Sequence, residues 1–341
     1  MKKRSLSLFV YVLALTAVMY NCKKGDPLEP DTQLVEELTS VKMDTVTLTK
    51  PAPVTSTPAT VTPSAQATAV SGGVASIAST GTVPATVTTA ASEVKAAITP
   101  AEVTKLATIT PATISTVASG GALPADLKSI LDKAGADPKL KAYLPTFTLP
   151  TVNGKAIPAR TGGVEGIAHT DGIDGINASP ECIAKGQEAF DAKKAELDKT
   201  KADELARAQS AYTTATSGLT AQETTCKTGV TSKYKPLRDG AQAAYATAAA
   251  NIAAAKSVLG EETASLLEAL NALALLGNLT VVNNLESAEG KACTELVTAL
   301  RSAADAAKKI NEDAVNANYQ KALKEAEAKK GEVIQSCHDQ G

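Results

Sequence analysis

Four cysteines in the second half of this 341-residue chain are the residues whose type and spacing point most clearly to chemistry. Cys182 and Cys226 are 44 residues apart, and Cys293 and Cys337 are also 44 residues apart. In an exported protein an even set of cysteines indicates disulfides, and the N-terminus of this chain, described below, predicts export. We therefore expect two disulfide bonds, for which four cysteines allow three connectivities.

Helix length excludes one of the three connectivities. The stretch from Cys293 to Lys330 has no Gly or Pro, and its apolar residues, Ile310 among them, recur at steps of three and four, which predicts one helix. On such a helix Cys293 and Cys337 would lie roughly 66 Å apart and could not pair. Two connectivities stay open. One is Cys182–Cys293 with Cys226–Cys337, and the other is Cys182–Cys337 with Cys226–Cys293.

The helices that must position these cysteines show a nearly regular seven-residue spacing of apolar side chains. One stripe covers residues 183–226, and a second covers 245–273 and passes through Gly260 without a change of register. We therefore favour three long helices in up-down-up order, the middle one from about 237 to 276, with the first connectivity. If a helix ends at Gly260 instead, a four-helix arrangement makes the outer helices antiparallel and gives the second connectivity.

The predicted fold class is all-α, with a disulfide-stapled bundle of three, alternatively four, long helices over residues 179–341. The chain has only ten aromatic residues and no tryptophan, so the core must be built from Ala and Leu. Such a thin core gains much of its stability from the crosslinks. The most apolar stretch of the bundle holds the candidate ligand-facing residues, which are Leu266, Leu270 and Leu273.

No pattern in the sequence predicts catalysis or metal binding. Nucleophilic catalysis needs a base beside the nucleophile, and the two histidines, His169 and His338, rule out a multi-histidine metal site within one chain. With 34 basic and 36 acidic residues, no global field favours nucleic acid. We therefore expect a protein that is not an enzyme and that has no catalytic residue, cofactor, metal site or nucleic-acid partner.

The two segments directly before the bundle differ in composition and in predicted structure. Residues 98–147 contain helix starts, of which Thr99-Pro100-Ala101-Glu102 has an N-cap Thr, Pro at the first helical position and Glu at the third. Thr110-Pro111 and Pro124-Ala125-Asp126 are similar, so we expect short helices there. Residues 148–178 are rich in Gly and predict a flexible linker.

Residues 22–97 are predicted to be a disordered, low-complexity spacer rich in Thr, Pro, Ala, Ser and Val. These five residue types make up 42 of the 50 residues from 51 to 100. A segment of this kind buries too little surface to offset its ordering entropy. As a flexible tether of about 75 residues it would span ~50 Å. The alternative is a Thr/Val-rich β-module, because residues 44–49 alternate in polarity.

The N-terminus carries an export signal. Lys2, Lys3 and Arg4 precede an apolar run that is too short to span a membrane, so residues 1–21 predict a signal peptide. Cys22 follows that run and resembles the lipobox cysteine of bacterial lipoproteins. With Met19 and Asn21 before it, the site is similar to the relaxed lipobox of spirochaete lipoproteins. The resemblance implies that the Cys22 thiol is acylated and anchors the chain in a membrane.

These observations predict an exported protein, lipid-anchored to a bacterial membrane, either the outer membrane or the cell surface. We expect a non-enzymatic structural or partner-binding, adhesin-like role, with a protein or a glycan as the partner. The alternative is that the helical bundle binds a lipid or another small ligand near Leu266, Leu270 and Leu273.

Overall fold

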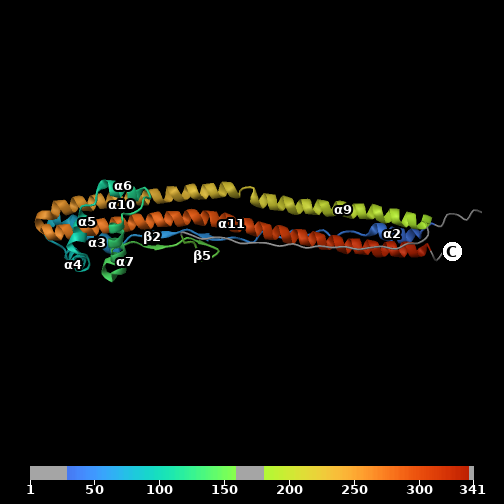
Figure 1. The fold of residues 1–341 in the computed structure, drawn as a ribbon, viewed down its shortest axis with the longest axis horizontal. Helices are drawn as coiled ribbons and strands as arrows, with labels where there is room; N and C mark the ends of the chain where they lie inside the picture. The colour runs from blue at the N-terminus through green and yellow to red at the C-terminus, as the bar shows by residue number, and fades with distance from the viewer. Residues whose placement is uncertain (1–28, 159–179, 338–341) are drawn as a thin grey trace, which may run out of the picture. The chain divides into compact units, whose positions relative to one another are not determined.

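The computed structural model describes residues 29–158 and 180–337, and within them the chain is mainly α-helical, which confirms the predicted fold class (Figure 1). Short helices and short strands precede three long helices. In chain order the elements are α2 (Thr32–Ser40), β1 (Ser56–Thr57), β2 (Thr60–Thr62), α3 (Ala65–Thr80), α4 (Ala85–Ala97), α5 (Pro100–Ala107), α6 (Pro111–Ala118), α7 (Ala125–Ala136), α8 (Pro138–Lys141), β3 (Thr146–Thr148), β4 (Thr151–Val152), β5 (Lys155–Ala156), α9 (Pro180–Thr216), α10 (Leu219–Leu259) and α11 (Glu261–Ser336).

The described residues form two compact units. Unit 1 takes those within Met1–Pro51, Glu165–Ala215 and Ala304–Gly341, and unit 2 takes those within Ala52–Val164 and Thr216–Ala303. Unit 1 therefore contains α2, α9 and the last part of α11. Unit 2 contains α10, the first part of α11, the helices α3 to α8 and all five strands.

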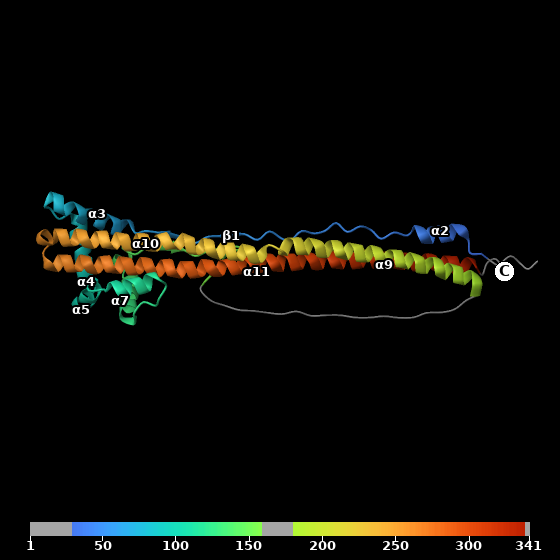
Figure 2. The ribbon, with the colours of Figure 1, turned by 90° about the horizontal axis from the view of Figure 1, so that it is seen from above.

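A turn of one residue joins α10 to α11. Gly260 lies between Leu259 and Glu261, and its φ of 75° is a conformation that glycine adopts without steric penalty. Within unit 2 the two helices run antiparallel, side by side (Figures 1 and 2). The predicted helix from 237 to 276 is therefore wrong, because the chain reverses at Gly260. Gly277, its predicted end, lies inside α11.

Both disulfides join α11, or the residue after it, to an earlier helix. Cys182 of α9 pairs with Cys337 in unit 1, and Cys226 of α10 pairs with Cys293 in unit 2, with Cα–Cα distances of 5.9 and 5.8 Å. The favoured connectivity, Cys182–Cys293 with Cys226–Cys337, is therefore wrong, and the alternative is present. The favoured connectivity required the first and third helices to run parallel, which the reversal at Gly260 prevents.

Residues 29–97 are folded, so the disordered tether predicted over 22–97 is wrong for this part. Leu38 of α2, Ile77 of α3 and Val94 of α4 are completely buried. Leu38 packs in the core of unit 1, and the other two pack with α10 and α11 in the core of unit 2. Burial against long helices stabilises sequences whose own helix propensity is weak. Residues 41–50 form no strand, and residues 22–28 lie outside the described part.

The short helices predicted within 98–147 are confirmed. Thr99 and Glu102 form a capping box at the start of α5, and α6 begins with Thr110 as its N-cap. The Lys133 ammonium, which donates a hydrogen bond to Glu102, and then the Thr99 N–H lower the pKa of the Glu102 carboxyl to about 2. The carboxylate therefore stays charged and holds this helix end over a wide pH range.

Part of the predicted linker at 148–178 is an ordered β-hairpin. β4 and β5 pair antiparallel, and β1 adds a third strand on the other side of β4. The turn is Asn153-Gly154, both with positive φ, which is a residue pair that such tight turns favour. Residues 159–178 of the predicted linker lie outside the described part, as do the histidines His169 and His338.

The buried stripe of α11 drifts away from the predicted seam. Ile310, placed in the seam by the seven-residue spacing, is 53% exposed, whereas its neighbour Asn311 is buried, as are Val315 and Tyr319. A helix of 3.6 residues per turn falls behind a 3.5-residue repeat, so a strict heptad extrapolated over several turns selects the wrong face.

Candidate functional site

Unit 2 contains an open apolar cavity with a volume of about 610 Å³. Its lining comes from α3, α10 and the first part of α11, together with Val61 of β2 and Pro63. Figure 2 shows α3 next to α10 in this part of the molecule. The cavity is therefore made by the helix hairpin together with a helix from the segment that composition predicted to be disordered.

Two glycines leave space in the cavity wall. A Cβ atom added at Gly72 of α3 or at Gly240 of α10 would have no atom within 4 Å. The neighbouring Gly73 differs, because a Cβ there would come within 2.9 Å of the Val87 side chain of α4. Gly73 therefore permits helix packing. Gly72 and Gly240 have no such contact, and both border the cavity.

Every residue that lines the cavity is uncharged. The polar side chains among them are largely engaged with the backbone, since Asn271 Nδ2 donates to the Tyr245 carbonyl at 2.9 Å and Asn278 Nδ2 donates to the Ala274 carbonyl at 2.8 Å. Burial, and after it the charge of Glu268, raise the pKa of the Tyr245 hydroxyl, so this side chain is neutral too. The wall thus offers apolar contact and carries no fixed charge.

The three predicted ligand-facing leucines have different positions. All three are buried in the core cluster that α11 forms with α3 to α5, α7, α8 and α10, and of the three Leu270 also lines the cavity. Their role toward a ligand stays a prediction. The sequence reasoning missed Gly240 and the whole α3 wall, and the signal for α3 was the helical spacing of Val70, Val74 and Ile77.

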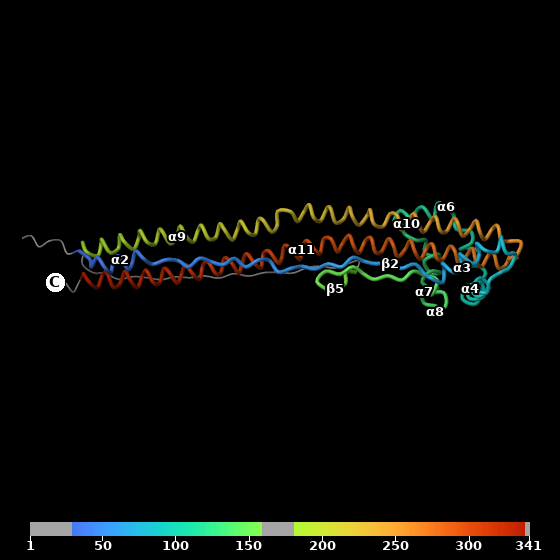
Figure 3. Tube along the Cα trace, turned by 180° about the vertical axis from the view of Figure 1, so that it is seen from behind, coloured from blue at the N-terminus to red at the C-terminus, as the bar shows by residue number. Residues whose placement is uncertain are grey.

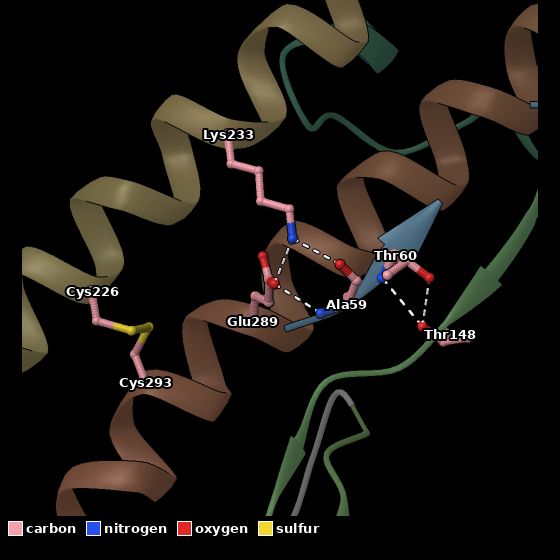
Figure 4. A network of polar contacts seen from close by, with 7 residues as sticks. All are labelled: Ala59, Thr60, Thr148, Cys226, Lys233, Glu289 and Cys293. Carbon is pink, nitrogen blue, oxygen red and sulfur yellow. Dashed lines mark hydrogen bonds and ion pairs between the residues drawn. A yellow bond between two sulfur atoms is a disulfide. The ribbon is translucent and has the colours of Figure 1, made fainter. Parts of the chain in front are cut away.

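A polar network lies beside the Cys226–Cys293 disulfide of unit 2 (Figure 4). Glu289 of α11 is only 6% exposed, and its Oε1 accepts from the Lys233 ammonium at 2.6 Å and from the Ala59 N–H at 2.8 Å. Lys233 of α10 also donates to the Ala59 carbonyl at 2.8 Å. Thr60 then continues the segment by pairing with Thr148. The network therefore attaches the β1–β2 segment to both long helices.

Tyr234 lies in the core beside this network, and its buried hydroxyl has no hydrogen-bond partner among the described residues. Its side chain is buried with Val230, Val282 and the Cys293 sulfur, and its ring lies 4.9 Å from the Lys233 ammonium. Burial, and next the Glu289 carboxylate, raise the pKa of the Tyr234 hydroxyl far above its usual value. The hydroxyl is thus protonated. Lys233, Glu289 and Tyr234 together fit a structural role, which is to hold the β1–β2 segment against α10 and α11.

Neither a metal site nor the predicted lipidation site lies within the described part of the chain. Among residues 29–158 and 180–337, no three His, Cys, Asp or Glu side chains are grouped so that they could hold a metal ion. Cys22, the predicted lipidation site, and the signal peptide at 1–21 lie outside the described part.

α11 is long and apolar enough to cross a membrane by length and composition alone. Its most apolar 18-residue window has a mean hydropathy of 1.6, but 61% of that window is buried inside the protein. A core helix that other helices cover has the same composition, so burial favours the interpretation as a core helix.

Comparison of the chain with protein-family models, curated proteins and solved structures finds no match.

Proposed function

We propose that this chain is an exported, lipid-anchored, non-enzymatic protein that binds an uncharged apolar small molecule in the cavity of unit 2. The observation that carries the proposal is the cavity itself. Small-molecule sites typically have volumes of about 300–1,000 Å³ and mostly apolar walls with a few polar groups. The cavity has about 610 Å³ and fits this description.

The uncharged wall supports the choice of ligand. A charged group that leaves water for an apolar site without a partner loses several kcal/mol of solvation. The lining supplies no ion pair to offset that loss, and its two amide side chains already donate to backbone carbonyls. An alcohol or a hydrocarbon chain suits such a wall, and a carboxylate does not.

Pairing of the cysteines supports the export part of the proposal. All four cysteines between 182 and 337 are in disulfides, which persist in oxidising compartments outside the cytosol. Cys22 is the one remaining cysteine of the five in the sequence, and no other cysteine is left to pair with it. This matches a thiol that is acylated. The adhesin-like role toward a protein or glycan stays a prediction.

Acylation can be tested by metabolic labelling in a bacterial host. We expect labelled palmitate to enter the full-length chain and to be absent from Cys22→Ala. The acyl group needs the Cys22 thiol, whereas the disulfide cysteines have none to offer. Labelling of Cys22→Ala at the wild-type level would disprove the anchor.

Ligand binding can be tested with Nile red, an uncharged fluorescent dye. We expect the dye to bind the wild type and Gly240→Leu to weaken binding roughly tenfold or more, which corresponds to about 1.4 kcal/mol. The added side chain occupies the open space at Gly240, and leucine has the higher helix propensity, so the variant keeps its stability. Decanol should displace the dye, and decanoate should do so much less.

The matched control is Gly331→Leu, which places the same side chain in open space on α11 in unit 1. It should leave the dye affinity unchanged. The binding proposal fails if wild type and Gly240→Leu bind the dye equally well, and equal displacement by decanol and decanoate contradicts the ligand class.

A further inference from the structure

We infer that the end of unit 1 that carries the Cys182–Cys337 disulfide faces the membrane surface. This inference rests on the proposed acylation of Cys22. It replaces the picture of a folded domain on a long flexible spacer, because the chain attaches to unit 1 almost immediately after the anchor.

The first described residues are fixed at this disulfide. The Glu29 carboxylate pairs with the Lys185 ammonium, three residues after Cys182 on α9. The Asp31 N–H donates to Ser336 Oγ, one residue before Cys337, at 3.4 Å. Two contacts, one to each partner helix, therefore hold the start of the segment at the crosslinked end.

The segment then runs antiparallel to α11 and away from that end, as Figure 3 shows. Its later residues contact progressively earlier positions of α11. The pairs are Glu37 with Lys329 at 2.7 Å, Asp44 with Lys321 at 2.9 Å and Thr49 N–H with Asn311 Oδ1 at 2.7 Å.

Buried side chains secure the same register. Leu38 and Val41 lie in the core of unit 1 beside Phe190 and Val315, and the Val46 N–H donates to Glu204 Oε2 at 3.3 Å. Between Asp44 and Thr49 the segment advances five residues, or about 17 Å when extended. Lys321 and Asn311 are ten residues apart, or about 15 Å along a helix. The two advances agree, so the segment runs in an extended conformation along α11, antiparallel to it.

The link from the anchor to this end is short. Seven residue steps separate Cys22 from Glu29, and a fully extended chain covers at most about 3.6 Å per step, which gives about 25 Å. The acylated thiol must lie at the membrane. Glu29 and its partner Lys185 are therefore held within roughly 25 Å of it, about half the distance that a flexible 75-residue tether would give.

Electrostatic attraction to anionic lipid does not favour an orientation in which unit 1 lies flat along the membrane. Its exposed lysines alternate with acids, as in the pairs Lys199–Asp203 on α9 and Lys309–Asp313 on α11. Attraction to anionic lipid needs a cluster of unpaired basic residues. The acyl chains alone then position the unit, and its crosslinked end lies closest to the lipid.

The absence of tryptophan from the sequence allows a direct test with single introduced tryptophans. Ala184 and Ala206 are both exposed on α9, and their separation of 22 positions corresponds to about six turns and ~33 Å, so both lie on one face. Ala184→Trp and Ala206→Trp would each be made in the acylated full chain and reconstituted into vesicles that contain dansyl-labelled lipid.

We expect energy transfer to the dansyl headgroup to be several-fold stronger from Ala184→Trp than from Ala206→Trp, and to vanish for both when Cys22→Ala is added. Equal or reversed transfer in protein that floats with the vesicles overturns the inference while the anchor stands. A chain that neither incorporates palmitate nor floats with vesicles overturns the anchor, and the inference with it.

Discussion

Replacement of both Cys226 and Cys293 by serine is expected to lower the free energy of unfolding by about 2–4 kcal/mol. This disulfide closes a loop with a sequence separation of 67 residues, for which the chain-entropy model gives about 4 kcal/mol as a model-dependent upper figure. The loss is large compared with the ~5–15 kcal/mol net stability of a typical domain. Urea denaturation under non-reducing conditions measures it.

The second disulfide provides the comparison. Cys182–Cys337 has a sequence separation of 155 residues, so loop entropy alone predicts a loss that is larger by about 0.7 kcal/mol. Reduction of the wild type should remove both contributions together. Denaturation midpoints that do not change in either double-serine variant would contradict a stabilising role for the crosslinks.

Lys233→Met is expected to destabilise unit 2 by about 2–3 kcal/mol. Breaking a fully buried ion pair costs ~3–5 kcal/mol, and the figure is reduced here because the Lys233 side chain is 39% exposed. The substitution leaves the buried Glu289 carboxylate without its cation, although the Ala59 N–H still donates to it. Thermal or urea unfolding measures the loss.

A second substitution tests the cause of that loss. Adding Glu289→Gln removes the buried charge and keeps an oxygen that accepts from the Ala59 N–H, so most of the lost stability should return. Lys235→Met is the control, because the Lys235–Asp239 pair is exposed and such pairs contribute at most about 1 kcal/mol. If Lys235→Met were as harmful as Lys233→Met, the loss would not come from the buried carboxylate.

The long helices could be predicted from sequence, but the point at which the chain reverses could not. Ile252, Leu259, Leu266 and Leu273 continue one seven-residue spacing across Gly260, and all four are buried. Two antiparallel helices that pack on each other both need an apolar face, so a one-residue turn between them leaves the spacing intact. Periodicity alone therefore does not distinguish one helix from a hairpin.

The positions of the cysteines indicate where the chain reverses. The disulfides of the structure share one midpoint, which lies between Leu259 and Gly260. Crosslinks nested around a common centre are what a hairpin with its turn at that centre requires. The equal spacing of 44 residues was visible in the sequence, and the coincidence of its centre with a glycine identifies the turn.

Composition gave a wrong prediction for the segment before the bundle and, with it, for one wall of the candidate site. Residues 51–100 are poor in large apolar side chains, which predicts disorder. Yet Val70, Val74 and Ile77 form one helical stripe that packs on α10 and α11, and Gly73 allows α4 to approach closely. Small side chains suffice when neighbouring helices supply the large ones, and this depends on tertiary contacts that composition does not record.

Nested crosslinks also determine what a protease can release from this protein. A single cut between Cys182 and Cys337, including one at the Gly260 turn, divides the polypeptide but leaves both pieces joined by at least one disulfide. A single nick in this region therefore releases no fragment until the disulfides are reduced. If the chain is anchored as proposed, the long helices would stay attached to the anchor after a cut that frees part of a linear polypeptide.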